Sequence, residues 1–341
     1  MFIRRVTALC AAIAVVASLP LGAQDEDKKD TPSLSKAEQQ DARVLIDLAD
    51  SMGEALPSEF PLTWRQNHFV MAQNGQTFIP FTLQLDPTSL PSSAVVLYVR
   101  AVKKGVAAPP PEGDDKKGDE MVVEYPWDNL EFLDVPADGL VARGLALSGG
   151  EYELFVGVKE LSTENEEEIK KTSVFRRDLS VPDFTKPELA ISSIIVADGM
   201  EGVEALAPEA QRANPYTFVT IKVTPSLDSK YQQTSALTLL FWVYGVTPDA
   251  MQKPDVQIDF SFHQKLPEGE KYFNKTAPQV LNATSPMLPA GFDLSAGHLV
   301  PGMLNMPLGS FPPGDYRCEV RVTDKLSGKS LTQNVAFNVA G

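Results

Sequence analysis

The sequence has few cysteines, a shortage of basic residues and no long apolar run, and each shortage excludes a class of protein. Its 341 residues include only 2 cysteines, so a small fold held together by disulfides is excluded. The 30 Lys and Arg residues are outnumbered by 45 Asp and Glu, giving a net charge of −15. This charge argues against nucleic acid as a partner, because phosphate binding needs a basic surface. No stretch reaches the roughly 18 apolar residues that span a bilayer, so no transmembrane segment is expected after signal cleavage.

Sequence motifs of common enzymes are missing as well. We find no GxSxG nucleophile turn, no GxxxxGK[ST] phosphate loop and no GxGxxG after a strand. The histidines His68, His263 and His298 lie far apart and have no metal-ligand spacing. With 45 acidic residues some carboxylate pair is always available, so such a pair says nothing about glycoside hydrolysis. We therefore predict a protein that is not an enzyme and has no cofactor and no metal.

The first 23 residues have the parts of a secretory signal peptide. Arg4 and Arg5 form a charged start, residues 8–19 form an apolar core, and Leu21-Gly22-Ala23 offers a small-residue cleavage site. A membrane anchor would need a longer apolar run. We expect residues 1–23 to be removed, which takes the net charge from −15 to −17. The expected location is the periplasm or the extracellular side of the cell envelope.

Cys318 is the one cysteine that remains after this cleavage. It lies in the run 316–322, where apolar residues alternate with Arg317, Glu319 and Arg321. This alternation predicts a strand whose apolar face carries the thiol. We expect a buried, unreactive cysteine; a reactive or dimer-linking thiol is the alternative.

One helix is predicted, after a flexible leader at residues 24–34. Ser35 and Glu38 form a capping-box pair, and apolar residues recur at helical spacing until Pro57, so the predicted helix spans residues 35–57. It either packs on the first domain or is an exposed arm that docks on a partner.

Beyond residue 60 the sequence is typical of antiparallel β-sandwiches. Runs rich in Val, Ile, Phe and Tyr are separated by Pro, Gly, Asp and Ser, with no convincing helix between them. The clearest runs span residues 78–85, 94–102, 152–158, 216–223 and 237–246.

An internal repeat suggests two copies of one module. The segment GEYELFVGVKEL (150–161) is similar to GDYRCEVRVTDKL (314–326), and upstream 81–90 and 93–102 are matched with 218–227 and 235–246. The predicted domains are an Ig-like sandwich at 58–182 and a second at 183–341, joined near PDFTKP. Residues 103–120 are predicted to form a mobile surface loop, and 162–171 an acidic hairpin tip.

The second half of the repeat contains a candidate interaction face. If Leu237, Leu239, Phe241 and Val243 point into the core, then Leu240, Trp242 and Tyr244 point outward. Side chains this large need cover. The other module or the helix, a protein partner, or a glycan are the alternatives, and a shift of one residue in register would put Trp242 in the core.

The sequence also resembles a known family. Asp315-Tyr316-Arg317-Cys318 resembles the Tyr-x-Cys of an immunoglobulin strand, without the partner cysteine, as in fibronectin type III modules. Residues 187–341, with NPYTFVTIKVTPSLDSKY and FPPGDYRCEVRVTDKLSGKSLTQNVAFNV, resemble the C-terminal Ig-like region of secreted acidobacterial proteins that often carry a GWxTD or von Willebrand A-like domain. The resemblance implies a disulfide-free sandwich in the cell envelope and no catalytic residues.

These observations predict a mainly β protein of two tandem antiparallel Ig-like sandwiches preceded by one amphipathic helix. The predicted function is that of an exported, non-catalytic protein-interaction, adhesion or scaffold module whose partner is an envelope protein. The first alternative is a carbohydrate-binding module with a platform built from Trp127, Tyr125 or Trp242. The second is a hydrolase whose site has no recognisable motif.

Overall fold

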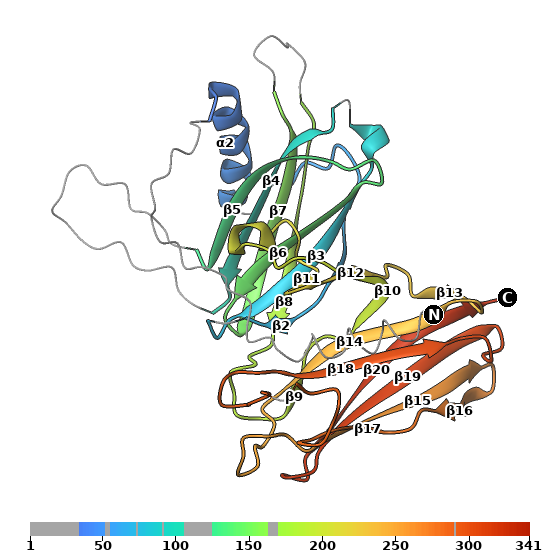
Figure 1. Cartoon of the computed structure of the whole chain (residues 1–341). Helices are drawn as coiled ribbons and strands as arrows, with labels where there is room; N and C mark the ends of the chain where they lie inside the picture. Colours follow the sequence, from blue (N-terminus) through green and yellow to red (C-terminus); the bar gives the residue numbers. More distant parts are fainter. Residues whose placement is uncertain are drawn as a thin grey trace. The chain divides into compact units, whose positions relative to one another are not determined.

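A computed structural model describes residues 34–341 except 52–54, 73, 91, 106–124, 163–169 and 290. The predicted signal peptide and most of the leader lie outside the described residues, as do most of the predicted loop at 103–120 and most of the hairpin tip at 162–171. The protein is mainly β, as predicted, with one α-helix among the described residues (Figure 1). None of the described helices is long and apolar enough to cross a membrane.

The chain forms two compact units. The first contains residues 34–66 and 81–183, and the second contains residues 67–80 and 184–341. The division after Asp183 lies at the predicted join, but the segment 67–80, expected in the first sandwich, belongs to the second unit. Two hydrogen bonds hold the segment there. The Ser193 amide donates to the Phe69 carbonyl oxygen at 3.0 Å, and the Phe69 amide donates to Ser193 Oγ at 2.8 Å.

Sheet A and most of sheet B lie in the first unit. Sheet A has the strand order β5 (Trp127–Asp134), β4 (Ala94–Lys103), β7 (Gly150–Glu160), β8 (Thr172–Val181). In sheet B, the central strand β3 (Thr77–Leu85) pairs with β1 (Leu62–Asn67), β2 (Val70–Met71) and β6 (Leu140–Leu147). Strand β2 and residues 77–80 of β3 are in the segment that belongs to the second unit. Leu83 and Val141 of sheet B and Leu97 of sheet A line the same apolar space. The two sheets therefore pack against each other.

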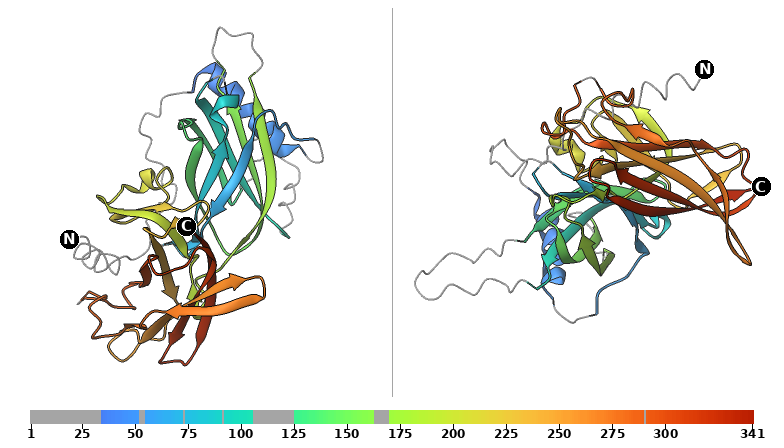
Figure 2. Two further views of the ribbon diagram at one scale, coloured as in Figure 1. Left: turned by 90° about the vertical axis from the view of Figure 1, so that its right-hand side faces the viewer. Right: turned by 90° about the horizontal axis from the view of Figure 1, so that it is seen from below.

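The helix α2 (Lys36–Asp50) lies against the other face of sheet A (Figures 1 and 2). Ser35 and Glu38 form the predicted capping box, with the Glu38 amide donating to Ser35 Oγ at 3.2 Å. The helix ends at Asp50 instead of residue 57. Asp47 and Asp50 stand near its C-terminus and its last turn has no basic residue, which is unfavourable for the helix dipole.

Sheet C is the first sheet of the second unit. It has the order β11 (Thr217–Phe218), β12 (Ile221–Pro225), β10 (Ile195–Gly202), β14 (Ala236–Tyr244), β18 (Val300–Pro307), and β9 (Ala190–Ile191) also pairs with β14.

Sheet D packs on sheet C. Its order is β13 (Lys230–Gln232), β20 (Ser330–Ala340), β19 (Gly314–Asp324), β15 (Val256–Leu266), β16 (Gly269–Lys275), and β17 (Gln279–Leu281) also pairs with β15. The core between the sheets contains Leu239 and Phe241 of β14 together with Phe260 of β15. Two short 3-10 helices, η1 (Pro87–Ser89) and η2 (Pro208–Gln211), occur in loops.

The two units share the strand order β5-β4-β7-β8 in sheet A and β16-β15-β19-β20 in sheet D. Tyr152 and Tyr316 occupy the same place, as the third residue of β7 and β19. Each hydroxyl donates to a carbonyl four residues upstream, at 2.8 Å and 2.7 Å respectively. Both expected upstream matches are wrong. The strand equivalent to β4 is β15, because β14 lies in the opposite sheet. The strand equivalent to β3 is β14 and not β12, because β14 pairs with β18 as β3 pairs with β6. Similar short apolar runs cannot reveal which sheet a strand joins.

Candidate functional site

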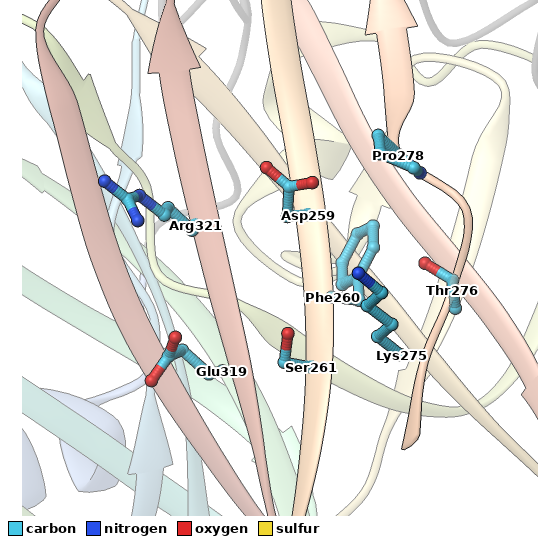
Figure 3. Close-up of a pocket in the computed structure, with 8 residues that line it drawn as sticks. All are labelled: Asp259, Phe260, Ser261, Lys275, Thr276, Pro278, Glu319 and Arg321. Atoms are coloured by element: carbon cyan, nitrogen blue, oxygen red, sulfur yellow. The ribbon is translucent and has the colours of Figure 1, made fainter. Parts of the chain in front are cut away.

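A pocket of about 300 Å³ opens on the outer face of sheet D (Figure 3). It lies where β15 changes partner, since β16 pairs with residues 261–266 and β17 pairs with 256–258. Asp259 falls between the two pairings, so its neighbouring position in the sheet is open. The residues that line the pocket are Asp259, Phe260, Ser261, Lys275, Thr276, Pro278, Glu319 and Arg321.

The strand sequences place these polar side chains outward. Every second residue is buried in β15 from Val256 to Phe262 and in β19 from Tyr316 to Asp324, as expected for strands with one solvated face. Asp259 is opposite Arg321 in the sheet, and Ser261 is opposite Glu319. Figure 3 shows Arg321 and Lys275 on either side of Asp259, so positive and negative side chains alternate across the pocket.

The acidic side chains of the pocket already have partners. The Gln257 amide donates to both carboxylate oxygens of Asp259, at 3.1 and 3.0 Å, and Arg317 donates to Glu319 at 3.0 Å. Within the described part of the chain, Arg321 and Lys275 make no ion pair. The pocket therefore offers two cationic donors, and its acids are already hydrogen-bonded.

An exposed aromatic residue stands beside the pocket. Tyr272 of β16 is 54% exposed and meets His263 edge-to-face, with ring centroids 5.9 Å apart. His263 follows Ser261 on the same face of β15. The Ser261 hydroxyl has no hydrogen-bonded base among the described residues, so the geometry suits holding a polar ligand better than activating a nucleophile.

The face predicted from Leu240, Trp242 and Tyr244 is buried in the interior of the second unit. Their exposed fractions are 1%, 5% and 3%. The inward residues Leu237, Leu239, Phe241 and Val243 do lie in the core, so the assignment of the two faces is confirmed.

The cover over this face comes from the same unit. Phe218 packs on Trp242 with ring centroids 4.9 Å apart, and Phe184 packs on Tyr244 at 4.7 Å. The Met71 amide donates to the Tyr244 hydroxyl at 3.0 Å, and burial raises the pKa of Tyr244. The sequence did not reveal the segment 67–80 as part of this cover, because nothing in it marks a segment that crosses to the other domain.

Tyr125 and Trp127, the other aromatic residues considered for a glycan platform, are half-buried. The Arg100 guanidinium lies 4.0 Å from the centroid of the Tyr125 ring and occupies one of its faces. These rings do not form an open platform with Trp242, which is in the interior of the second unit.

Cys318 and the histidines are separate from one another. Cys318 is fully buried, and burial raises the pKa of its thiol to about 12. Burial also lowers the pKa of His68 to about 4, and its Nδ1 lies 3.2 Å from the Tyr216 hydroxyl. His298 Nδ1 accepts from the Asp293 amide at 2.9 Å. Among the residues that the structure describes, no three His, Cys, Asp or Glu side chains are grouped to hold a metal ion.

Comparisons with known proteins give no functional assignment. No family model matches the chain, and no characterised protein matches its sequence. Matches among solved structures include Salmonella alpha-2-macroglobulin reacted with methylamine (11% identity, TM-score 0.20), trypsin-activated alpha-2-macroglobulin from Escherichia coli (10%, 0.23) and Bacteroides uniformis beta-glucuronidase (9%, 0.24). They cover 84%, 84% and 77% of this chain but only 17%, 17% and 26% of those chains. Likenesses this weak carry no argument about function.

Proposed function

We propose that this chain is an exported, non-catalytic module of the cell envelope that binds a protein partner through the outer face of sheet D. The observation that carries the proposal is the open pocket in which Arg321 and Lys275 flank Asp259 without pairing. A surface that alternates both signs complements another mixed-charge protein surface, whereas a nucleic acid would need a uniformly basic one. The proposed export is supported by the signal-peptide pattern in the sequence of residues 1–23.

A crosslinking experiment tests this proposal. A photoreactive residue at Thr276, in the pocket, is compared with one at the exposed Lys325 of the same unit, using native envelope extract and mass spectrometry. We expect a specific protein crosslinked at residue 276, absent from residue 325 and lost when Arg321 and Lys275 are both changed to Ala. Equal crosslinking at both positions, or a crosslink that the double variant retains, would contradict the proposal.

A saccharide is the second candidate ligand for the same face, favoured by the exposed ring of Tyr272 next to the pocket. Aromatic rings stack on sugars, and the carboxylate and hydroxyl groups of Asp259 and Ser261 could hydrogen-bond sugar hydroxyls. Glycan-array binding that Tyr272→Ala abolishes would support a saccharide ligand and count against a protein partner.

A further inference from the structure

A second pocket, of about 240 Å³, lies at the end of sheet D where strand β19 begins. Among its lining residues, Lys265, Asp315, Asn338 and Lys230 come from β15, β19, β20 and β13 and are directly opposite one another in the sheet. Residues directly opposite in a sheet share a face, and so do residues an even number apart in one strand. Asp315 is six residues before Arg321 in β19, so this second pocket opens on the same outer face as the first pocket, around Asp259.

The charges of the second pocket repeat those of the first. Asn338 Nδ2 donates to Asp315 Oδ1 at 2.7 Å, and the Lys230 amide donates to Asp228 Oδ1 at 3.0 Å. Both Lys230 and Lys265 are exposed, and their ammonium groups make no ion pair with any residue that the structure describes. Each pocket therefore combines acids that are already hydrogen-bonded with two cations that have no acidic partner.

The surface between the two pockets has its charges paired. Arg317 is bonded to Glu270 at 2.9 Å and to Glu319 at 3.0 Å. In the same row of the sheet, His263 is opposite both Arg317 and the exposed Tyr272. A ligand that lies along this face thus meets unpaired positive charge at two places, with a neutral stretch between them.

The strand geometry sets the spacing of these two places. Lys230 and Lys265 are level with Asp315, and six residues of β19 separate Asp315 from Arg321. At about 3.4 Å per residue this separation is about 20 Å. An extended peptide has nearly the same rise, so two of its side chains six residues apart can reach both pockets and point in the same direction. A helix, which rises about 1.5 Å per residue, would need about 13 residues to do so.

We propose that the partner of sheet D presents an extended acidic segment, in which one carboxylate binds to Arg321 and Lys275 and another, about six residues away, binds to Lys230 and Lys265. This inference rests on the proposed function, because it names the part of the protein partner that the face binds. Charge complementarity supports it: carboxylates match the unpaired cations of both pockets. The net charge of −15 repels an acidic segment elsewhere on the protein.

Synthetic peptides test the spacing. Two ten-residue peptides of Gly, Ser and Thr each carry two glutamates, six residues apart in one peptide and three apart in the other, so that their charge is equal. We expect the six-spaced peptide to bind the full chain at least ~fivefold more tightly in fluorescence-polarisation titrations, because its second carboxylate binds within the same complex. Equal affinity for the two peptides, or no binding of either at about 1 mM, would overturn the proposal.

Charge reversal in the second pocket is the sharper test. We expect Lys230→Glu combined with Lys265→Glu to weaken binding of the six-spaced peptide at least ~tenfold. The matched control makes the same change of charge at Lys186 and Lys325, two exposed lysines that line neither pocket, and its affinity should stay within about twofold of the wild type. Melting temperatures verify that both variants are folded. A second-pocket variant that binds as tightly as the control would refute the two-pocket arrangement.

The crosslink at Thr276 separates failure of this inference from failure of the proposed function. A specific protein crosslink that persists in the variant with Glu in place of both Lys230 and Lys265 leaves protein binding at the first pocket intact and contradicts the extended acidic segment. Absence of any specific crosslink in the wild type contradicts the proposed function, and the inference with it. A polyuronate that needs both pockets, while neither peptide binds, would replace the acidic peptide with an acidic polysaccharide.

Discussion

Sheet A and sheet D share a strand order, yet helix α2 covers the outer face of sheet A while the outer face of sheet D is open and polar. When Tyr152 is matched with Tyr316, Phe155 corresponds to Glu319 and Gly157 to Arg321. The strand registers then match Tyr98 with Asp259. The positions that contact α2 in one unit thus line the pocket in the other, which shows that outward side chains decide whether a face is covered.

The inward residues differ much less. Leu154 corresponds to Cys318, and both are fully buried. Glu160 and Asp324, the acids at the ends of the two strands, are each 1% exposed. The same core positions therefore support two outer faces of opposite character.

The largest effect is expected from giving sheet A the charge of sheet D. Tyr98→Asp removes a buried ring and places a carboxylate under the helix, so we expect the free energy of unfolding to fall by at least about 4 kcal/mol. Asp259→Tyr, the reverse change on the open face, should alter it by less than about 1 kcal/mol. Urea denaturation measures both variants. Similar losses for the two variants would mean that the faces do not differ as described.

The thiol of Cys318 tests whether the inward positions are equivalent. Because burial raises its pKa to about 12, we expect a thiol reagent at neutral pH to label the native protein at least ~100-fold more slowly than the denatured one. Leu154→Cys should add a second protected thiol, and Ser261→Cys, on the outer face, a rapidly labelled one. Rapid native labelling at residue 154 would show that the two strands are not equivalent.

A smaller effect is expected at Gly157 of β7, where the absence of a side chain leaves room for Leu45 of α2. Gly157→Ala brings a methyl group against Leu45, Phe155 and Val174, and should cost about 1–3 kcal/mol of stability. The matched control is Arg321→Ala at the equivalent open position, with a change within about 0.5 kcal/mol. Thermal unfolding of both variants provides the comparison. An unchanged melting temperature for Gly157→Ala would indicate that the packing of α2 on sheet A does not require a glycine at this position.

The smallest effect concerns the strand-end acid Asp324. Burial raises the pKa of Asp324, but hydrogen bonds from Ser327, Thr247 and Leu326 outweigh it and leave the pKa below its ordinary value. Because the folded pKa is lowered, this stabilisation is present above the unfolded value near 3.8 and is lost as the pH falls through the folded pKa.

The substitution Asp324→Asn should therefore cost about 1 kcal/mol at pH 7. Its difference from the wild type should shrink as the pH is lowered through the folded pKa. Urea denaturation at a series of pH values measures this, and a difference that grows in acid would contradict the stated shift.

Much of the local structure follows from sequence patterns. The capping box at Ser35 and Glu38, the inward residues of β14 and the buried side of Cys318 were all predicted, because each depends on neighbours three residues away or on simple alternation. The pocket on sheet D was not predicted. It depends on β15 changing from β16 to β17, and a strand sequence does not reveal its partners.

The sequence by itself determined the mainly β class, the start of the helix and which residues of a strand share a face, because these depend on local hydrogen bonding and on the period of two. Tertiary structure decided what covers each face. Segment 67–80 and Phe218 bury Trp242 and Tyr244, α2 covers Tyr98, and nothing described covers Asp259. Cover of this kind arises from packing between segments far apart in the chain, and short-range patterns do not encode which segments will meet.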